Sequence, residues 1–434
     1  MFERPPTLQT PAHRYAGVAL TTLTVINLLN YLDRYLISAL AQSLKVSSLA
    51  LNDFQLGLLA PGFLIVYMLS APAFGALGDT RSRPRLIALG IACWSLATGL
   101  SGAVQSFWSL MCARAAVGIG EAAYGTIAPG LLADYFRRDQ RGRIMAVFYC
   151  AIPVGAALGY MVGGWVDQHF GWRMAFFLAG FPGLALAIMV WLLPDPPRGA
   201  HDEGQPVAAG AGANVHWLDY WRRIRHVVSS RSYNLTVLGY AAYTFGIGAL
   251  GFWMPSFLER VRGMPRIEAT VGFGAIVAVC GFVGTLLGGW LGDHLARRSR
   301  QAFLWLSGIA TLIAAPLVWV ALSTGSNLAY WISMVAAQLC LWLSAGPVNA
   351  TIVNLSAPSE RATAFALSIL TIHLLGDAIS PPLIGLISNA GTLAAAMRIV
   401  PVSIALAAVL WIWAARAQRC EPVAGVREIP GPPS

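Results

Sequence analysis

Four charged residues stand inside apolar stretches that are long enough to cross a lipid bilayer. Asp33 and Arg34 are adjacent in NLLNYLDRYL, and Arg114 and Glu121 share the stretch RAAVGIGEAAYGTIAPGLLADYF. A charge in hydrocarbon costs from about 2.5 to more than about 10 kcal/mol, so it persists where it pairs, lines a cavity or takes part in function. We expect these four residues to form an ion-pair and proton-coupling site, because arginines can hold an anionic ligand and carboxyl groups can exchange protons.

The rest of the chain has the composition of an all-α integral membrane protein. Of its 434 residues, 57% are hydrophobic and 11% are charged, against roughly 25% charged in soluble domains. A bilayer core needs roughly 20 apolar residues per helix, and β-barrel strands would alternate apolar and polar residues instead. Twelve apolar runs predict twelve transmembrane helices, at 16–43, 55–78, 86–106, 108–133, 142–166, 174–193, 232–257, 270–292, 302–322, 328–355, 362–388 and 393–415.

Basic residues predict the orientation of these helices. With twelve spans both termini share a side, and that side carries 21 of the 29 Lys and Arg residues. The positive-inside rule therefore predicts that both termini are cytoplasmic, and we expect the protein in the plasma (inner) membrane. The net charge of +10 is a topology signal and gives no support to nucleic-acid binding. The expected parts are a tail (1–15), a six-helix bundle (16–193), a linker with an amphipathic helix (194–231), a second bundle (232–416) and a tail (417–434).

Two sequence motifs that each occur twice indicate that the chain is a duplicated six-helix unit. GALGDTRSRPR after the second helix returns as GWLGDHLARRSR after the eighth, and RGRIMA after the fourth returns as RATAFA after the tenth. The residues of the first repeated motif are expected at the cytoplasmic mouth; they are Gly75, Asp79, Arg81, Arg83, Gly289, Asp293, Arg297 and Arg298.

This organisation resembles the major facilitator superfamily, whose members have two pseudo-symmetric six-helix bundles and bind substrate near the midplane. Within it, NYLDRYLISAL, RAAVGIGEAAYGTIAPGLLADYF and FYCAIPVGAALGYMVGG resemble the spinster family, mainly in the N-terminal half, and the compact chain is of prokaryotic type. The resemblance implies transport of a lipid-like amphipathic substrate, such as a lysophospholipid or a sphingoid phosphate. It also implies that the repeated cytoplasmic residues form a gate motif that holds the outward-facing state; the alternative is that its arginines only set the topology, and both can be true. The glycine- and proline-rich fifth helix favours antiport by the same resemblance, although a packing role is equally open.

Helix depth predicts which charges meet. At ~1.5 Å per residue, Asp33 lies roughly 12 Å below the outer end of its helix and Arg114 about 9 Å below the same surface. The two are level and are predicted to pair if the first and fourth helices are neighbours, as the superfamily fold implies. Glu121 lies about 10 Å deeper, near the midplane, where we expect only apolar neighbours and water.

A mechanism follows from this arrangement. Asp33 should stay ionised beside Arg114, whereas Glu121 without a counter-charge can take up a proton near neutral pH. Protonation and substrate binding would compete for these groups, and alternating access would couple proton flow to transport. The alternative is a static ion pair with a glutamate that bonds to backbone.

Polar residues within the spans predict a substrate cavity. In the first helix, Asn27, Asn30 and Arg34 share one face, which forms either a cavity wall or a polar stripe against neighbouring helices. His373 and Asp377 also share a face, and can satisfy each other, bind protons or contact substrate. The predicted cavity residues are Asn27, Asn30, Tyr31, Tyr124, Tyr240, Tyr243, Asn349, His373 and Asp377. A charged N-terminal wall and an aromatic and amide C-terminal wall suit a ligand with a polar head and an apolar tail.

The sequence gives little support to other functional classes. The sequence has no HExxH, no GxSxG and no metal-spaced histidine cluster, so we expect neither an enzyme nor a metal or other cofactor. No strand precedes GIGEAA, which excludes a dinucleotide site. We expect a monomeric secondary transporter whose partners are its small-molecule or lipid substrate, protons and membrane lipids. The alternative is a proton-coupled transporter of a sugar, an organic anion or a drug-like solute.

Overall fold

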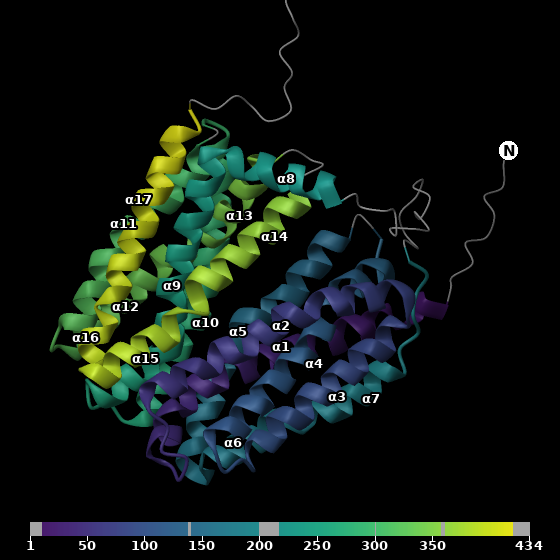
Figure 1. Ribbon diagram of the computed structural model, residues 1–434, viewed down its shortest axis with the longest axis horizontal. Coiled ribbons are helices and arrows are strands. Elements are labelled where there is room, and N and C mark those ends of the chain that lie inside the picture. Colours follow the sequence, from purple (N-terminus) through teal and green to yellow (C-terminus); the bar gives the residue numbers. More distant parts are fainter. Residues whose placement is uncertain (1–10, 138–139, 199–216, 300, 357–360, 420–434) are drawn as a thin grey trace, which may run out of the picture. The chain divides into compact units, whose positions relative to one another are not determined.

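The computed structural model describes residues 11–137, 140–198, 217–299, 301–356 and 361–419. The regular elements of this described part are all helices (Figure 1), as predicted. Most of both predicted tails and the central part of the predicted linker lie outside the described residues. The predicted amphipathic helix is present as α8 (Trp217–Ser229).

The helices of the N-terminal half follow the predicted spans. They are α1 (Pro11–Val46), α2 (Asp53–Thr80), α3 (Arg83–Ser101), α4 (Phe107–Tyr135), α5 (Arg141–Phe170), α6 (Trp172–Gly180) and α7 (Pro182–Trp191). Capping boxes start α2, at Asn52 and Gln55, and α4, at Ser106 and Ser109. The sixth predicted span is divided into α6 and α7 because Pro182 has no N–H to continue the first helix.

The helices of the C-terminal half are more interrupted. They are α9 (Arg231–Arg260), α10 (Arg266–Ala296), α11 (Ala302–Ser323), α12 (Asn327–Trp342), α13 (Ala345–Asn354), α14 (Arg361–Ile372), the π-helical turn η1 (His373–Asp377), α15 (Ser380–Ala390), α16 (Leu393–Met397) and α17 (Ile399–Ala417). The interruption before α15 is where Pro381 and Pro382 predict a kink.

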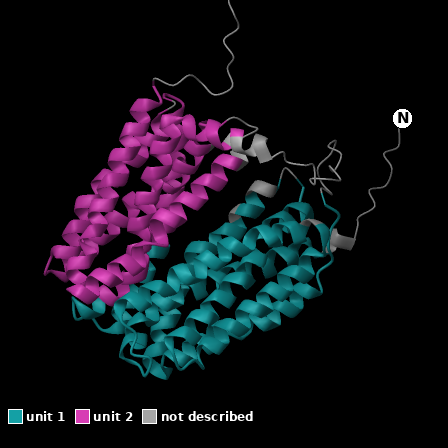
Figure 2. Ribbon diagram, in the orientation of Figure 1, with its two compact units in different colours: residues 1–211, 258–278 teal, residues 212–257, 279–434 magenta. Residues whose placement is uncertain are grey.

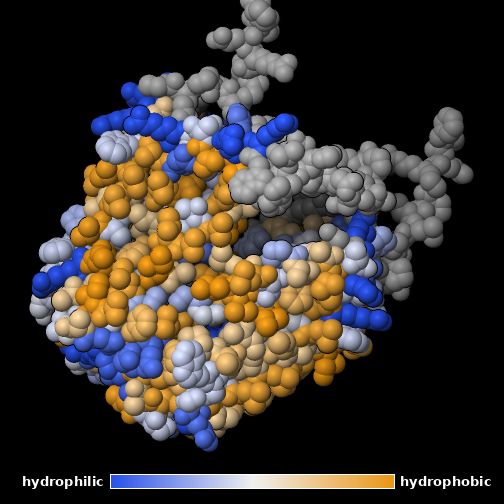
Figure 3. Space-filling model, viewed as in Figure 1, coloured by the Kyte–Doolittle hydropathy of each residue, from blue (hydrophilic) through white to orange (hydrophobic). Residues whose placement is uncertain are grey.

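The membrane-spanning character of the chain is confirmed. In the described part, eleven helices are long and apolar enough to cross a membrane. The remaining predicted span is α4, which has 29 residues and contains both Arg114 and Glu121. Its charges and glycines lower its mean hydropathy, so α4 is the polar exception among the predicted spans. Figure 3 shows an apolar surface between hydrophilic residues that gather toward helix ends.

The chain divides into two compact units (Figure 2). Unit 1 comprises residues 1–211 and 258–278, and unit 2 comprises residues 212–257 and 279–434. The ends of α9 and α10 that face each other along the chain therefore belong to unit 1. In unit 1, α3 packs against α4 and α7; in unit 2, the equivalent helix α11 packs against α12 and α17. The same packing in both units agrees with a duplicated six-helix unit.

Close packing of α1 against α5 places the charged face of α1. A side chain at Gly155 would collide with the carbonyl oxygen of Leu28, and one at Gly159 with that of Leu32. These glycines thus let two helix backbones touch, as small residues at four-residue spacing do in membranes. The structure gives the glycine-rich face of α5 a packing role.

Candidate functional site

The four intramembrane charges meet between α1 and α4 in unit 1. Arg114 Nη1 donates to Asp33 Oδ2 at 3.2 Å, and Arg34 Nε donates to Glu121 Oε2 at 2.7 Å. Asp33, Arg114 and Glu121 are 1%, 2% and 0% exposed, whereas the Arg34 side chain is 24% exposed. The predicted pair of Asp33 and Arg114 is confirmed. The four residues form two ion pairs, of which only the Arg34–Glu121 pair has an accessible member.

The expectation that Glu121 has no charged partner is wrong. It compared the depths of Cα atoms, but side chains on a helix lean toward the helix N-terminus. In the predicted topology α1 runs outward, so the Arg34 side chain extends inward, toward the level of Glu121. The length of an arginine side chain covers the remaining difference in depth. Glu121 is therefore neutralised by the neighbour of Asp33.

The two pairs differ in their surroundings. Asp33 Oδ2 also accepts a hydrogen bond from Thr98 Oγ1 on α3 at 3.0 Å, so this pair joins α1, α3 and α4. Asp33 Oδ1 and Glu121 Oε1 are buried and have no hydrogen-bond partner among the described residues. A buried acceptor without a partner costs free energy. Glu121 thus keeps one oxygen, Oε1, that is available to accept a proton.

Aromatic rings surround the accessible arginine. The Arg34 guanidinium carbon lies 5.0 Å from the ring centre of Tyr31, 4.9 Å from that of Phe63 and 5.2 Å from that of Tyr67. Phe63 also lies 5.2 Å from the guanidinium of Arg114. Cation–π contacts of this kind stabilise a cation that is partly out of water. Phe63 and Tyr67 on α2 were missed from sequence, although their spacing of four residues puts both on one helix face.

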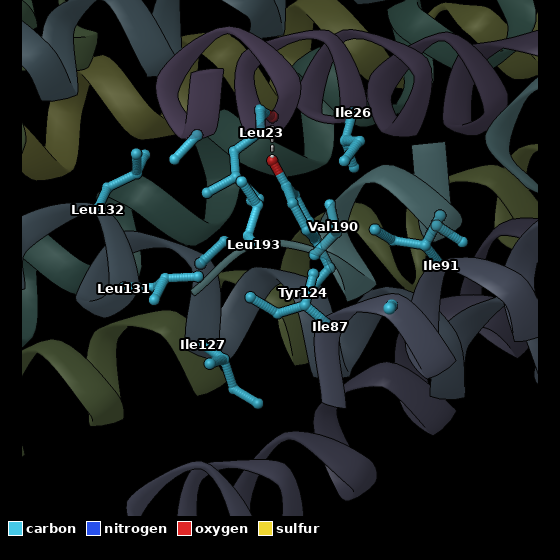
Figure 4. Packing of buried hydrophobic residues seen from close by; sticks show 14 of the residues in the cluster. Leu23, Ile26, Ile87, Ile91, Tyr124, Ile127, Leu131, Leu132, Val190 and Leu193 are labelled. Atoms are coloured by element: carbon cyan, nitrogen blue, oxygen red, sulfur yellow. Dashed lines mark hydrogen bonds between the residues drawn. The ribbon is translucent and has the colours of Figure 1, made fainter. Parts of the chain in front are cut away.

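Several predicted cavity residues of unit 1 instead hold helices together. Tyr124 is 2% exposed in the hydrophobic core, where its hydroxyl donates to the Leu23 carbonyl at 2.6 Å (Figure 4). Its placement on a cavity wall is therefore wrong, because the ring fills space between helices and the hydroxyl is satisfied by backbone. Asn27 is buried and donates to the Phe148 carbonyl at 2.9 Å, which matches the polar-stripe alternative. Asn30 is also buried.

The polar residues of unit 2 gather near the π-helical turn η1. His373 Nδ1 lies 2.9 Å from Asp377 Oδ1, and both side chains are partly exposed. The two residues satisfy each other, which is the first alternative drawn from sequence, and π-helical turns are frequent at functional sites. Asn349 Nδ2 donates to the Tyr240 hydroxyl at 3.3 Å. Tyr243, in contrast, is buried and donates to the Leu341 carbonyl, so its cavity assignment is wrong.

Hydrogen bonds and ion pairs connect the first gate motif to other segments of unit 1. Buried Arg83 donates to Asp134 at 2.5 Å, to Asp195 at 2.9 Å and to the Pro196 carbonyl at 2.6 Å. Arg198 donates to the carbonyl oxygens of Gly78 and Arg81. These bonds join the α2–α3 junction to the end of α4 and to the segment after α7.

Sequence reasoning missed both acidic partners, because Asp134 directly follows a predicted span and Asp195 lies in the predicted linker. The side chain of Asp79 lies outside the described part of the chain. In the second motif copy, Asp293, Arg297 and Arg298 are exposed.

A second network lies at the opposite, predicted outer, end of unit 1. Asp53, which is 1% exposed, accepts from Lys45 Nζ at 2.6 Å and from both terminal nitrogens of Arg260 at 2.9 Å. Asp167 accepts from Ser43 at 2.6 Å and from Arg266 at 2.8 Å. The facing ends of α9 and α10 are thus bonded to α2 and α5. Sequence reasoning missed both aspartates, whose partners are remote along the chain.

Buried ion pairs in a duplicated, all-α membrane protein are typical of one class of transporter. The sequence profile of the Major Facilitator Superfamily matches residues 23–381, and the chain belongs to that superfamily. A solved bacterial homologue of the human lysosomal transporter spinster, described as inward-facing and unoccupied, has a TM-score of 0.84 and 24% identity. The match covers 96% of this chain and 100% of that one, which shows the shared fold.

Within the superfamily, the chain belongs to the spinster family. It is 36% identical over 405 residues to protein spinster homolog 3 of Danio rerio, covering 89% of this chain and 80% of that protein. It is 35% identical over 407 residues to protein spinster of Drosophila melanogaster, covering 89% of this chain and 65% of that protein. The similarity therefore extends through both halves, beyond the N-terminal half where the sequence motifs showed it. The chain is a multi-pass membrane transporter of a small-molecule substrate rather than a member of an enzyme class.

Proposed function

We propose that the protein is a secondary active, proton-coupled transporter of a lipid-like substrate with an anionic head group, working by alternating access. The observation that carries this proposal is the Arg34–Glu121 pair, in which a partly exposed cation holds a fully buried carboxylate. One partner can meet a ligand and the other can hold a proton.

The surroundings of Arg34 favour an amphipathic anion. A phosphate or similar head group forms strong charge-assisted hydrogen bonds with a guanidinium. Tyr31, Phe63 and Tyr67 offer apolar ring surface next to that cation. A lysophospholipid or a sphingoid phosphate has both the anionic head and the apolar chain that this combination suits. These are also the substrate classes that the resemblance to spinster proteins implies.

The pairing also determines how a proton and the substrate are coupled. A buried carboxylate that loses its cation is strongly destabilised. When the anionic head group binds the Arg34 guanidinium, Glu121 loses its ion-pair partner and takes up a proton. Protonation of Glu121 in turn releases Arg34 for the head group, as reciprocal coupling requires. The proton and an anionic substrate therefore bind together, whereas the sequence suggested that they compete, so cotransport replaces antiport in this proposal.

Binding measured at two pH values tests the coupling. Affinity of the purified protein for sphingoid phosphate should be higher at acidic than at alkaline pH. Glu121→Gln, which mimics the protonated acid, should bind equally well at both pH values. Arg34→Gln should weaken binding at both. Wild-type affinity that does not change with pH, or that falls on acidification, would overturn the coupling.

The nature of the substrate is tested separately. Ligands that bind the folded state raise the melting temperature. We expect sphingoid phosphate or lysophospholipid to raise it, and glycerol phosphate, which has the head group alone, to do so only at far higher concentration. Equal effects of the two ligands would favour a small organic anion. A response to sugars or cationic drugs alone would contradict the proposal.

The proposal includes a monomer in the plasma membrane with both termini in the cytoplasm. The orientation in this proposal rests on the unequal distribution of Lys and Arg between the two sides. A cysteine placed in the C-terminal tail should react with an impermeant maleimide only after the cells are opened. Labelling of intact cells would contradict this orientation.

A further inference from the structure

Unit 2 contains a groove that takes no part in the proposed transport site. Its volume is about 450 Å³, and it lies between the end of α10 and the helices α11 and α12. Six of its lining residues carry the argument: Leu295, Arg298, Ser299, Trp305, Ile309 and Ile313. None of the four intramembrane charges belongs to it.

The walls of the groove suit hydrocarbon. Ile309 and Ile313 are 49% and 51% exposed on α11, a helix that is long and apolar enough to cross a membrane. Exposed isoleucines at that position face acyl chains rather than water. Trp305 lies one turn nearer the end of the helix, and tryptophan is enriched at the level of the lipid head groups. The groove thus runs from the interfacial level into the hydrocarbon.

The interfacial end of the groove is cationic. Arg298 lines the groove and is exposed, and Arg297 precedes it. Arg419, whose Nε donates to Gln301 at 2.9 Å, and Arg416 in the last turn of α17 lie on the same side, since α17 packs against α11. Clusters of arginine at this level attract anionic lipid head groups. In Figure 3 hydrophilic residues gather where α17 ends.

We propose that this groove binds one anionic diacyl phospholipid of the surrounding leaflet. The phosphate accepts hydrogen bonds from Arg298 and Ser299, and an acyl chain lies along Ile309 and Ile313. The basic residues at the rim favour a lipid with net negative charge over a zwitterionic one. The occupant is a lipid of the membrane, separate from the transported substrate.

Native mass spectrometry of the full chain, released from nanodiscs, tests the site. With phosphatidylglycerol and phosphatidylcholine in equal amounts, the wild type should retain one phosphatidylglycerol. Arg298→Gln should lose it, whereas Arg297→Gln, a matched change at the same end, should keep it. Ile309→Trp, which fills the groove at an exposed position, should also lose it. Melting temperatures in phosphatidylcholine alone should stay unchanged, which shows that the variants are folded.

Three outcomes of the lipid-retention experiment would overturn the proposal. They are retention of phosphatidylglycerol by both Arg298→Gln and Ile309→Trp, equal retention of phosphatidylcholine, and equal loss in Arg297→Gln, which would indicate a diffuse surface charge. Displacement of the retained lipid by lysophospholipid at stoichiometric concentration would show that the groove takes transported substrate instead. Transport of the candidate substrates by Arg298→Gln is measured separately, so failure of this site and failure of the proposed function are distinguishable.

Discussion

Replacing Arg34 by methionine removes the cation that neutralises Glu121 while keeping an apolar stem. Loss of one partner of a buried ion pair costs about 3–5 kcal/mol, because the other charge stays buried. Arg34 is 24% exposed, so the pair is partly screened, and we expect a value near the lower end, about 3 kcal/mol. A loss of this size can be avoided if Glu121 takes up a proton instead.

The sign of the pH dependence follows from that proton. In Arg34→Met the folded state holds a proton on Glu121 that the unfolded state releases, so the free energy of unfolding falls as pH rises. The slope is about 1.4 kcal/mol per pH unit. A penalty of about 3 kcal/mol therefore develops over about two pH units above the ordinary titration range of a glutamate. Below that range the variant should approach wild-type stability.

Thermal unfolding across a pH series, in one detergent, measures this effect. Arg173→Met is the matched control, because Arg173 Nη1 donates to the carbonyl oxygens of Gly102 and Val104 and the change exposes no acid. The control should lose stability equally at all pH values. Adding Glu121→Gln to Arg34→Met should remove the pH dependence and restore most of the stability. A pH-independent loss in Arg34→Met, or no recovery in the double variant, would refute the reasoning.

Three further substitutions have expected outcomes. Asp33→Asn leaves Arg114 buried without a counter-charge, so the free energy of unfolding should fall by about 3–5 kcal/mol in thermal melts; a neutral effect would show that this pair is not structural. Asp53→Asn weakens the bonds from Lys45 and Arg260 and should lower the melting temperature; an unchanged melting temperature would argue against a structural role for this network. Gly155→Leu should abolish the monodisperse peak in size-exclusion chromatography through its clash with α1, and a normal profile would contradict the close packing.

The sequence was sufficient to predict features that depend on local composition and on the depth of a residue in the membrane. Helices of the described part cover all twelve apolar runs, and eleven runs give helices long and apolar enough to cross a membrane, because the length of such a run is set by the thickness of the bilayer. The level of Asp33 and Arg114 could be counted along two helices, and the ion pair is where that count predicts. The proline pair in the first turn of α15 likewise marked an interruption of the span without any knowledge of tertiary structure.

Features that depend on the reach of side chains or on remote partners were not predictable in the same way. Glu121 was assigned no partner because Cα depth ignores the length and direction of the Arg34 side chain. Asp53 binds Arg260, which is far away in sequence, and no local sequence pattern predicts that contact. Tyr124 shares a helix with Glu121, but only the packing of α4 against α3 and α1 shows that its ring is in the core.

The two ion pairs divide structural and functional demands between them. Asp33 and Arg114 are both buried, and Thr98 adds a third helix to their contact. Breaking this pair would leave a full charge buried away from water, so the pair is suited to hold α1, α3 and α4 in place. In the other pair, Arg34 reaches an accessible surface and Glu121 retains an oxygen without a partner. That pair can open at low cost when a ligand anion replaces the carboxylate and a proton neutralises it. In the proposed function, the difference in exposure between Arg34 and Arg114 makes one pair a scaffold and the other an exchangeable site.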